Sequence, residues 1–398
     1  DLRRIAHESY AGFGHAAIAP LKQLDANLWL MELFHGPTIA FKDMAMQMLA
    51  RLFDHVLKRR GERVTIVGAT SGDTGSAAIE ACRDREAIDV FILFPAGRVS
   101  EVQRRQMTTV DAPNVHAIAV EGTFDDCQDI VKALFNDQAF RDEMALSAVN
   151  SINWARVMAQ IVYYVHAALA LGAPDRPVAF SVPSGNFGNV YAGYAAQAMG
   201  LPVGGLILGS NRNDILTRFI DHGDMSMATV HPTISPSMDI QVASNFERFL
   251  FDLYGRDGMA LADAMTRFRA ERRLDVGADR LARSQATFAA YRLDDDETRA
   301  VIRAEYERTG ELLDPHSAIG VGAARARHHD ASVPVVALAT AHPAKFPDAV
   351  EAARGIRPAL PPRMADLFDR PERMTQLPND IAAIQRFVRR HVALAGAA

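Results

Sequence analysis

The sequence is poor in the features that mark several specialised classes of protein. Its two cysteines, Cys82 and Cys127, are far apart and form no CxxC pair, so neither a disulfide scaffold nor a cysteine zinc site is expected. No apolar run approaches the length of a membrane span, and the first residues show no basic-then-apolar signal pattern. The thirteen histidines include no HExxH motif, and no metal site is indicated.

Charge of either sign is also in no large excess. A formal net charge of −5 over 398 residues gives no argument for nucleic acid or an anionic membrane as a partner. With 49% apolar and 23% charged residues, the composition is that of a globular protein, and its length allows two or three domains. We expect a cytoplasmic protein in a reducing setting, with a small molecule as its partner.

One short stretch around a lysine organises the chain. Residues 34–43 read FHGPTIAFKD, a Gly-Pro turn followed by Lys42 at the head of a periodic segment. Apolar residues recur after it at three- and four-residue spacing, which predicts a helix with one buried face. The helix dipole disfavours a cation in the first turn, so the amine of Lys42 is more easily neutral and can attack a carbonyl carbon. A surface lysine beside a turn is the alternative interpretation.

Strands alternate with helices along the rest of the chain. Strands are predicted at 27–33, 64–67, 89–94, 115–120, 177–182, 206–208 and 334–339. This alternation predicts an α/β fold with parallel sheets covered by helices on both faces. We expect a small α/β domain at 66–168 and a large domain formed by 1–65 and 169–398, with a helical insertion at about 213–310. The tail at 381–391 is predicted to be an amphipathic helix packed on the body.

Two glycine-rich loops each lie between a predicted strand and a predicted helix. They read GATSGDTG at 68–75 and PSGNFGN at 183–189. Such a loop directs backbone N–H groups and a helix N-terminus at an anion, at the carboxyl edge of the sheet where ligands bind. Neither loop matches a Walker loop or the GxGxxG pattern, so a small phosphate ester is favoured over ATP. Tight turns without a ligand are the alternative.

A third polar stretch reads NSINWAR at 150–156. Its two amides, hydroxyl and guanidinium suit a phosphate or a carboxylate, with Arg156 as the fork-shaped charge. The alternative is a polar helix cap followed by a surface arginine.

Further polar residues follow the last predicted strand. The stretch TAHPAK at 340–345 places Thr340 and Lys345 at the ligand edge of a sheet. Two other polar stretches, 237–239 and 314–317, could be helix caps or site residues, and we favour caps.

Taken together, these stretches resemble the threonine synthase family, pyridoxal-phosphate enzymes of fold type II (the tryptophan synthase β-like superfamily). The resemblance covers nearly the whole chain. Its motifs are HGPTIAFKD at 35–43, GATSGDTGSAA at 68–78, NSINWAR at 150–156, PSGNFGN at 183–189, SMDIQVASNFERFLF at 237–251 and ATAHPAKFP at 339–347. The stretch from 213 to 310 is similar to the longer, bacterial and fungal type. Members of that type carry a leading segment, which we expect to precede Asp1 in the native protein.

The resemblance implies two three-layer lobes with parallel sheets and pyridoxal 5'-phosphate as cofactor. It implies that Lys42 is catalytic and forms a Schiff base with the cofactor, and that Thr340 hydrogen-bonds the pyridine nitrogen. The cofactor phosphate would be held by the loop of Gly185, Asn186, Phe187, Gly188 and Asn189. The substrate carboxylate would be received by Thr70, Ser71, Gly72, Asp73 and Thr74. The substrate phosphate would be bound by Ser151, Asn153, Arg156 and Lys345.

The implied enzyme is a carbon–oxygen lyase that converts O-phospho-L-homoserine and water to L-threonine and phosphate. The chemistry is γ-elimination followed by β-addition of water, the last step of threonine biosynthesis. The nearest alternative is a related lyase that releases 2-oxobutanoate or dehydrates serine or threonine, although the set at 151–156 favours a phosphorylated substrate. A non-catalytic binder of phosphorylated metabolites would require that Lys42 form no imine. We expect a monomer or a weak homo-oligomer.

Overall fold

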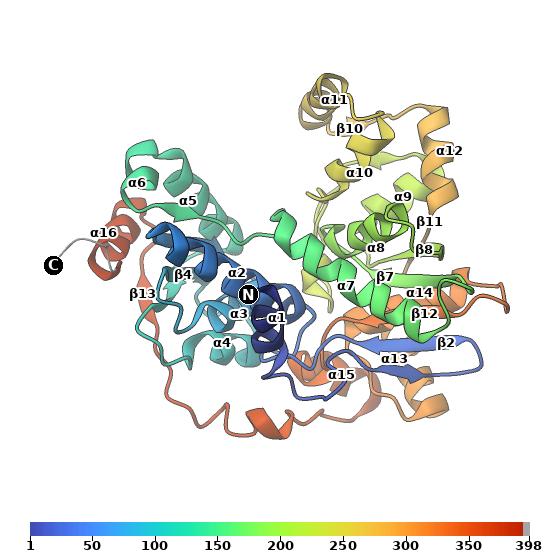
Figure 1. Cartoon of the computed structure of the whole chain (residues 1–398), viewed down its shortest axis with the longest axis horizontal. Helices are drawn as coiled ribbons and strands as arrows, with labels where there is room; N and C mark the ends of the chain where they lie inside the picture. Colours follow the sequence, from blue (N-terminus) through green and yellow to red (C-terminus); the bar gives the residue numbers. More distant parts are fainter. Residues whose placement is uncertain (393–398) are drawn as a thin grey trace. The chain divides into compact units, whose positions relative to one another are not determined.

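The computed structural model describes residues 1–392, and these form two compact units (Figure 1). Of the described residues, unit 1 contains 1–18, 35–156 and 360–392. Unit 2 consists of residues 19–34 and 157–359. The chain therefore enters unit 1, crosses to unit 2 twice, and returns to unit 1 at its end.

Unit 1 is built on a five-stranded sheet whose neighbouring strands are all parallel. The strand order is β13 (Thr375–Leu377), β5 (Val115–Val120), β4 (Ile88–Pro95), β3 (Val64–Ala69) and β6 (Leu146–Ser147). Strand β13 comes from the C-terminal part of the chain, more than two hundred residues after its partner β5.

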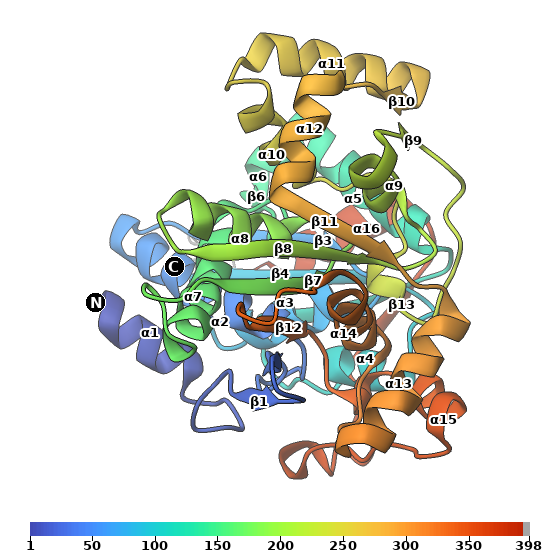
Figure 2. The same cartoon turned by 90° about the vertical axis from the view of Figure 1, so that its right-hand side faces the viewer.

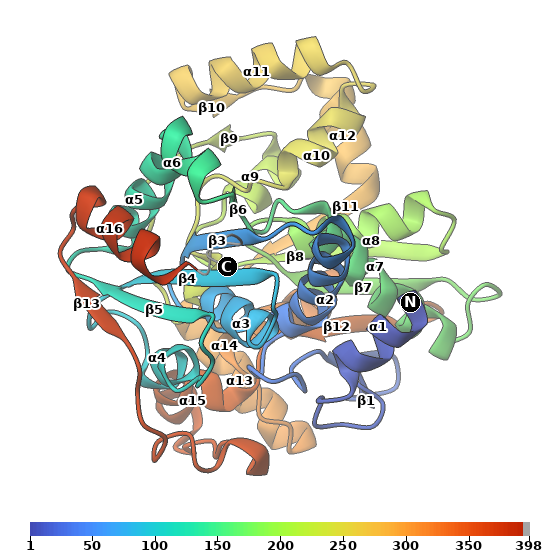
Figure 3. The same cartoon turned by 60° about the vertical axis from the view of Figure 1, so that its left-hand side comes forward.

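Alternate residues of these strands pack on opposite faces of the sheet, as the strand period of two requires. Ile66, Val90 and Ile92 belong to one buried cluster, whereas Val67 and Phe91 belong to another. The first face is covered by α2 (Lys42–Arg60), α3 (Asp73–Cys82) and α4 (Glu101–Thr108). The second is covered by α5 (Phe124–Asn136), α6 (Gln138–Glu143) and α16 (Ile381–His391) (Figure 3). Helix α1 (Leu2–Tyr10) packs on α2.

Unit 2 is built on a six-stranded sheet, parallel except for its first strand. The order is β1 (Leu21–Gln23), β2 (Leu28–Glu32), β12 (Val335–Ala339), β7 (Val178–Pro183), β8 (Val203–Ser210) and β11 (Phe288–Arg292). Strands β12 and β7 are adjacent and parallel, so the segments that follow them leave the sheet at the same edge.

Helices cover both faces of the six-stranded sheet (Figure 2). One face carries α14 (Pro315–Arg327), with α13 (Asp295–Thr309) and α15 (Pro347–Arg354) packed beyond it. The other carries α8 (Gly188–Ala198) and α7 (Trp154–Ala170), through contacts of Tyr164 with Phe180 and of Gly193 with Leu206. The remaining elements include α9 (Ile215–His222), β9 (Met225–Ser226), η1 (Pro236–Met238), α10 (Phe246–Leu253), α11 (Gly258–Glu271), β10 (Arg273–Leu274) and α12 (Ala278–Thr287).

The α/β class with parallel sheets is confirmed, and each predicted strand lies within or overlaps an observed one. The stretch at 213–310 is mainly helical as expected, but it also contains β11, which extends the large sheet. The boundaries of the two compact units differ from those of the predicted domains, which are 66–168 for one and 1–65 with 169–398 for the other. The cause is that α2 packs on α3, and that β13 and α16 return to the five-stranded sheet.

Candidate active site

Helix α2 begins at Lys42, as the sequence predicts, and the turn before it is held by the next residue. Asp43 is fully buried, and its carboxylate accepts hydrogen bonds from the backbone N–H and the hydroxyl of Thr38, at 2.8 and 2.7 Å. A Cβ at Gly36 would lie 2.3 Å from the Cβ of Asp43. Only glycine fits there, so the local sequence fixes both the turn and the position of Lys42.

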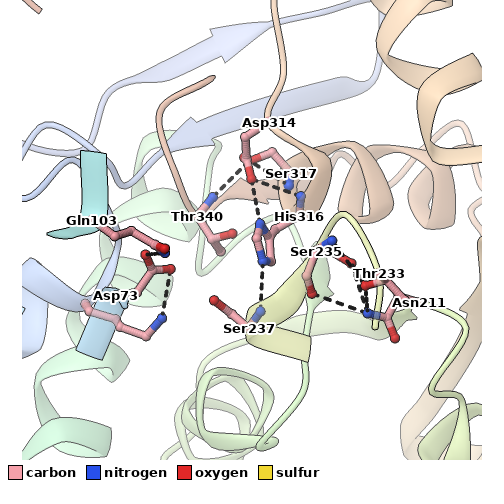
Figure 4. Close-up of polar contacts among 11 residues, drawn as sticks. Asp73, Gln103, Asn211, Thr233, Ser235, Ser237, Asp314, His316, Ser317 and Thr340 are labelled. Carbon is pink, nitrogen blue, oxygen red and sulfur yellow. Dashed lines mark hydrogen bonds and ion pairs between the residues drawn. The ribbon is translucent and has the colours of Figure 1, made fainter. Parts of the chain in front are cut away.

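The amine of Lys42 is placed beside a carboxylate. Its Nζ lies 3.3 Å from Oδ2 of Asp73, and the Lys42 side chain is 11% exposed. Oδ1 of Asp73 accepts a hydrogen bond of 2.8 Å from Nε2 of Gln103 (Figure 4). Gln103 also belongs to the capping box that begins α4. No prediction from the sequence included Gln103, although the Ser100–Gln103 capping pattern marks its helix start.

The loop at 70–75 is shaped by one side chain and one glycine. Oγ1 of Thr70 accepts from the N–H groups of Gly72 and Gly75, at 3.0 and 2.9 Å. Gly72 has φ +144°, and a Cβ on it would lie 2.3 Å from Cδ of Gln103. Thr70 and Asp73 are buried, Ser71 is exposed and Thr74 is half-buried. The loop therefore runs tightly into the N-terminus of α3, which is the geometry of an anion site.

Residues 150–156 contain both caps and a buried cation. Asn153 accepts from the N–H of Ala155 at 3.0 Å, so its oxygen is used locally, and Ser151 is half-buried. Arg156 is 3% exposed, which shows that the surface-arginine interpretation is wrong. Its Nη1 donates to the carbonyl oxygen of Val149 at 3.0 Å, whereas its buried Nε has no hydrogen-bond partner. Burial lowers the pKa of Arg156 to about 10. A buried donor left unpaired suits an anionic ligand.

In unit 2, the loop at 183–189 follows β7 and Thr340 follows β12, so both lie at one edge of the six-stranded sheet. Helix α8 begins at Gly188. Phe187 has φ +61°, an uncommon backbone conformation for a residue other than glycine, and is fully buried. Its ring lies edge-to-face against Phe246, at 5.0 Å between centroids. Such a conformation persists where packing holds it, and it is common at functional sites.

The same loop lies against the segment that contains Ser237. A Cβ on Gly185 would lie 2.9 Å from the carbonyl oxygen of Ser237 and 3.0 Å from Cα of Met238. The carbonyl oxygen of Asn186 accepts from the N–H of Asn245 at 3.1 Å. The loop is thus a backbone cradle that a larger residue at position 185 would fill.

Asn189 completes this cradle at the start of α8. Its Oδ1 accepts from the hydroxyls of Tyr163 and Tyr164, and its Nδ2 is buried without a hydrogen-bond partner. Burial raises the pKa of Tyr164 well above its usual value, so this hydroxyl remains a donor. An unpaired N–H at a helix N-terminus fits the phosphate group of a cofactor. No sequence motif marked the two tyrosines.

The last predicted site residues lie after β12. Thr340 is buried, and its N–H donates to Oγ of Ser317 at 3.0 Å. Lys345 is fully buried at the end of η2 (Pro343–Lys345). Asp314 caps α14, which confirms the cap interpretation for 314–317, whereas Ser237 lies within η1 and Asp239 follows it.

Comparisons with known proteins place this chain among its relatives. Residues 15–277 match the family of pyridoxal-phosphate dependent enzymes, and residues 317–388 match the C-terminal family of threonine synthase. The threonine synthase of Pseudomonas aeruginosa is 58% identical over 392 residues, which are 98% of this chain and 84% of that protein. That of Corynebacterium glutamicum is 45% identical over 397 residues, 98% of this chain and 82% of that protein.

A crystal structure of PLP-bound threonine synthase from Brucella melitensis is 54% identical in sequence, with a TM-score of 0.97. The alignment covers 99% of this chain and 84% of that one. The fold and the site thus define a pyridoxal-phosphate-dependent enzyme of fold type II. Within unit 2, the Gly185 cradle and the unpaired Asn189 amide fit the phosphate of the implied cofactor, pyridoxal 5'-phosphate. Within unit 1, the buried amine of Lys42 suits an aldehyde. More narrowly, the chain belongs to the threonine synthase family.

No helix within residues 1–392 is long and apolar enough to cross a membrane. In the same residues, both Cys82 and Cys127 are buried free thiols.

Proposed function

We propose that this enzyme converts O-phospho-L-homoserine and water to L-threonine and phosphate. The observation that carries the proposal is 58% identity to a threonine synthase across 98% of this chain. The relative's name gives the product, and the phosphorylated substrate is supported by the buried Arg156, whose Nε has no hydrogen-bond partner. The enzyme acts on a small molecule, and none of the proposed roles needs a macromolecular partner.

The chain's own residues divide the work of holding the cofactor. We assign Lys42 to the cofactor aldehyde, because its amine is buried and lies at the start of a helix. The loop from Gly185 to Asn189 holds the phosphate through backbone N–H groups and the free amide of Asn189. The hydroxyl of Thr340 donates to the pyridine nitrogen. Once bound, pyridoxal phosphate withdraws electrons from the substrate carbons.

Lys42 is also the base of the reaction. Its Nζ takes the proton from the α-carbon of the substrate and then one from the β-carbon. After phosphate has left, a proton returns to the γ-carbon, which becomes the methyl group of threonine. Water then supplies the hydroxyl at the β-carbon, and Nζ returns a proton to the α-carbon at the end. Asp73, held from its other side by Gln103, keeps this amine at the N-terminus of α3. The carboxylate therefore orients the base.

Two sets of residues bind the substrate. The loop formed by Thr70, Ser71, Gly72, Asp73 and Thr74 receives the carboxylate at the N-terminus of α3. Asp73 acts there through its backbone N–H, since its own carboxylate is held by Lys42 and Gln103. The phosphate is bound by Ser151, Asn153, Arg156 and Lys345, and it leaves from the γ-carbon with its charge stabilised by the two cations.

Product analysis tests the reaction. The protein, loaded with pyridoxal phosphate, is incubated with O-phospho-L-homoserine, and threonine, phosphate and 2-oxobutanoate are quantified. We expect equal amounts of threonine and phosphate. A Lys42→Ala variant should form neither product, whereas Lys132→Ala, which removes an exposed lysine on α5, should match the unmodified protein. 2-Oxobutanoate in place of threonine, or full activity of Lys42→Ala, would overturn the proposal.

We further propose that the enzyme works in the cytoplasm as a monomer or weak homo-oligomer. All residues assigned above come from one chain, so none of the proposed roles needs a second copy. Sedimentation of the holoenzyme across a hundredfold range of concentration tests this, and a tight oligomer at the lowest concentration would contradict it.

A further inference from the structure

Asp314 makes more hydrogen bonds than a helix cap requires. It is fully buried, and its carboxylate accepts the N–H groups of His316 and Ser317 at 2.9 and 3.1 Å, which caps α14. The same carboxylate also contacts Nδ1 of His316, at 2.8 Å, and Oγ of Ser317 (Figure 4). Asparagine or serine caps a helix about as well as aspartate. The two side-chain contacts therefore point to a second role.

The contact between Asp314 and the Ser317 hydroxyl leads to Thr340. A carboxylate only accepts hydrogen bonds, so the Ser317 hydroxyl must donate its proton to Asp314. The lone pairs of the Ser317 oxygen are then directed at the N–H of Thr340, which donates to it at 3.0 Å. Asp314 thereby orients Ser317, and Ser317 fixes the backbone at the end of β12.

The contact between Asp314 and the His316 ring leads to Ser237, which lies beside the Gly185 loop. The N–H of Ser237 donates to Nε2 of His316 at 3.3 Å, so Nε2 carries no proton and Nδ1–H donates to Asp314. In turn, a Cβ on Gly185 would lie 2.9 Å from the carbonyl oxygen of Ser237. His316 thus links the carboxylate to the wall of the cradle.

Hydrogen bonds hold the chain two residues after Ser237, at Asp239. Oδ1 of Asp239 accepts from Asn211, Asn213 and Thr233, at 2.8, 3.0 and 2.6 Å. Because this network holds the chain at Asp239, the hydrogen bond from Ser237 to His316 sets the position of the backbone at Ser237. A displacement of His316 would therefore move the Ser237 backbone relative to Gly185.

We propose that Asp314 is a positioning residue that sets two sides of the cofactor site, Thr340 through Ser317 and the Gly185 cradle through His316. The inference rests on the proposed function, which assigns Thr340 to the pyridine nitrogen and the cradle to the phosphate. The two arms touch different ends of the cofactor, so they predict different defects. A purely structural cap predicts only a loss of stability.

Two measurements on purified protein separate the arms. The absorption band of the Lys42-bound cofactor reports the pyridine nitrogen, because hydrogen bonds to the ring nitrogen tune the cofactor's electronic state. The Kd for pyridoxal phosphate, obtained by titrating the apoprotein, reports the cradle. Thermal unfolding of each apoprotein reports the fold.

Ser317→Ala should displace the absorption band and its pH dependence while changing the Kd less than about threefold, and Ser317→Thr should restore the band. His316→Phe should raise the Kd about tenfold or more with the band in place. Asp314→Asn should show both defects. Two matched controls lie elsewhere in unit 2. Ser284→Ala removes a buried hydroxyl on α12, and Asp294→Asn alters the same kind of cap on α13. Both should behave as the unmodified protein does.

The outcomes distinguish this inference from the proposed function. An unmodified protein with no Lys42-dependent band would overturn the proposed function itself. The positioning role alone would be overturned if the unmodified protein binds the cofactor and both Asp314→Asn and Ser317→Ala show its absorption band and its Kd. If Asp314→Asn fails to fold, Ser317→Ala and His316→Phe decide, since both leave the cap of α14 intact.

Discussion

Nζ of Lys42 and Oδ2 of Asp73 lie 3.3 Å apart, although 31 positions separate the two residues in the sequence. The contact joins the first residue of α2 to the first residue of α3. Each residue is presented by a tight turn that contains a glycine, so the geometry of the base depends on backbone conformation as much as on its own side chain.

Gly72→Ala should destabilise the protein more than an ordinary glycine substitution. It adds backbone strain at φ +144° and places a Cβ 2.3 Å from Cδ of Gln103. We expect a loss of about 2–5 kcal/mol in the free energy of unfolding, together with a large loss of activity. Gly97→Ala is the control, because Gly97 has φ +68° with nothing near its missing Cβ. It should lose only about 1–2 kcal/mol. Urea unfolding of both variants measures the difference.

Gly185→Ala should weaken cofactor binding. The new methyl group would press on the Ser237 backbone at 2.9 Å, and overpacking of this kind costs about 1–3 kcal/mol. If that strain falls on the bound state, the Kd for pyridoxal phosphate rises about tenfold. Gly205→Ala, on β8 with no atom within 4 Å of the added Cβ, is the control. Equal affinities for the two variants would show that the loop at 185 does not hold the cofactor.

Ile384→Ala should unfold unit 1 more easily than Ile381→Ala. Both residues lie on α16, but Ile384 is 0% exposed in the cluster with Phe91, whereas Ile381 is 43% exposed. The buried substitution should cost about 2–4 kcal/mol and the exposed one less than about 1 kcal/mol. Similar melting temperatures for the two variants would mean that α16 does not pack on the sheet in solution.

His116 should make the protein less stable in mild acid. Burial, with a smaller contribution from the nearby His391, lowers the pKa of His116 from 6.5 to about 4. Between these values the unfolded chain binds a proton that the folded chain does not, so stability falls as the pH drops through this window. The ring is partly exposed to solvent, so we expect a loss of about 1 kcal/mol between pH 7 and pH 5.

The matched variants for this effect are His116→Phe and His7→Phe. Phenylalanine preserves the stacking on Phe91, where the ring centroids are 4.4 Å apart, and it cannot be protonated. His116→Phe should therefore remove most of the acid sensitivity in urea titrations, whereas substitution of His7, which is exposed on α1, should leave it unchanged. An unaltered pH dependence in His116→Phe would assign the effect to other groups.

The sequence predicts well those parts of the fold that are determined by residues close together in the chain. The Gly-Pro turn and the periodic apolar residues after Lys42 fix the start of α2 within a few residues of chain. The strand, loop and helix around Gly185 are likewise set by neighbouring residues, since a glycine-rich turn between a strand and a helix needs no distant partner. For the same reason Thr340 could be placed at a sheet edge from the strand before it.

What the sequence could not predict depends on pairings across long separations. Gln103 reaches Asp73 from another helix, and Asp314 reaches Thr340 only through Ser317. Strand β11 follows a run of helices and is a strand because β8 offers it an open edge. For Arg156 the sequence left a surface position open as the alternative to anion binding, because its burial comes from tertiary packing, which no local period encodes.

The return of the chain to unit 1 has a consequence for how the protein is made. A ribosome adding about 5–20 residues per second needs roughly 10–45 s to pass from the end of β6 to β13. During that time β5 has an open edge, and the surface that α16 will cover is bare. Newly made chains at this stage are the form most open to mispairing and to capture by chaperones. A chain that ends just before β13 would therefore contain every strand of the six-stranded sheet of unit 2, while unit 1 would lack β13 and α16.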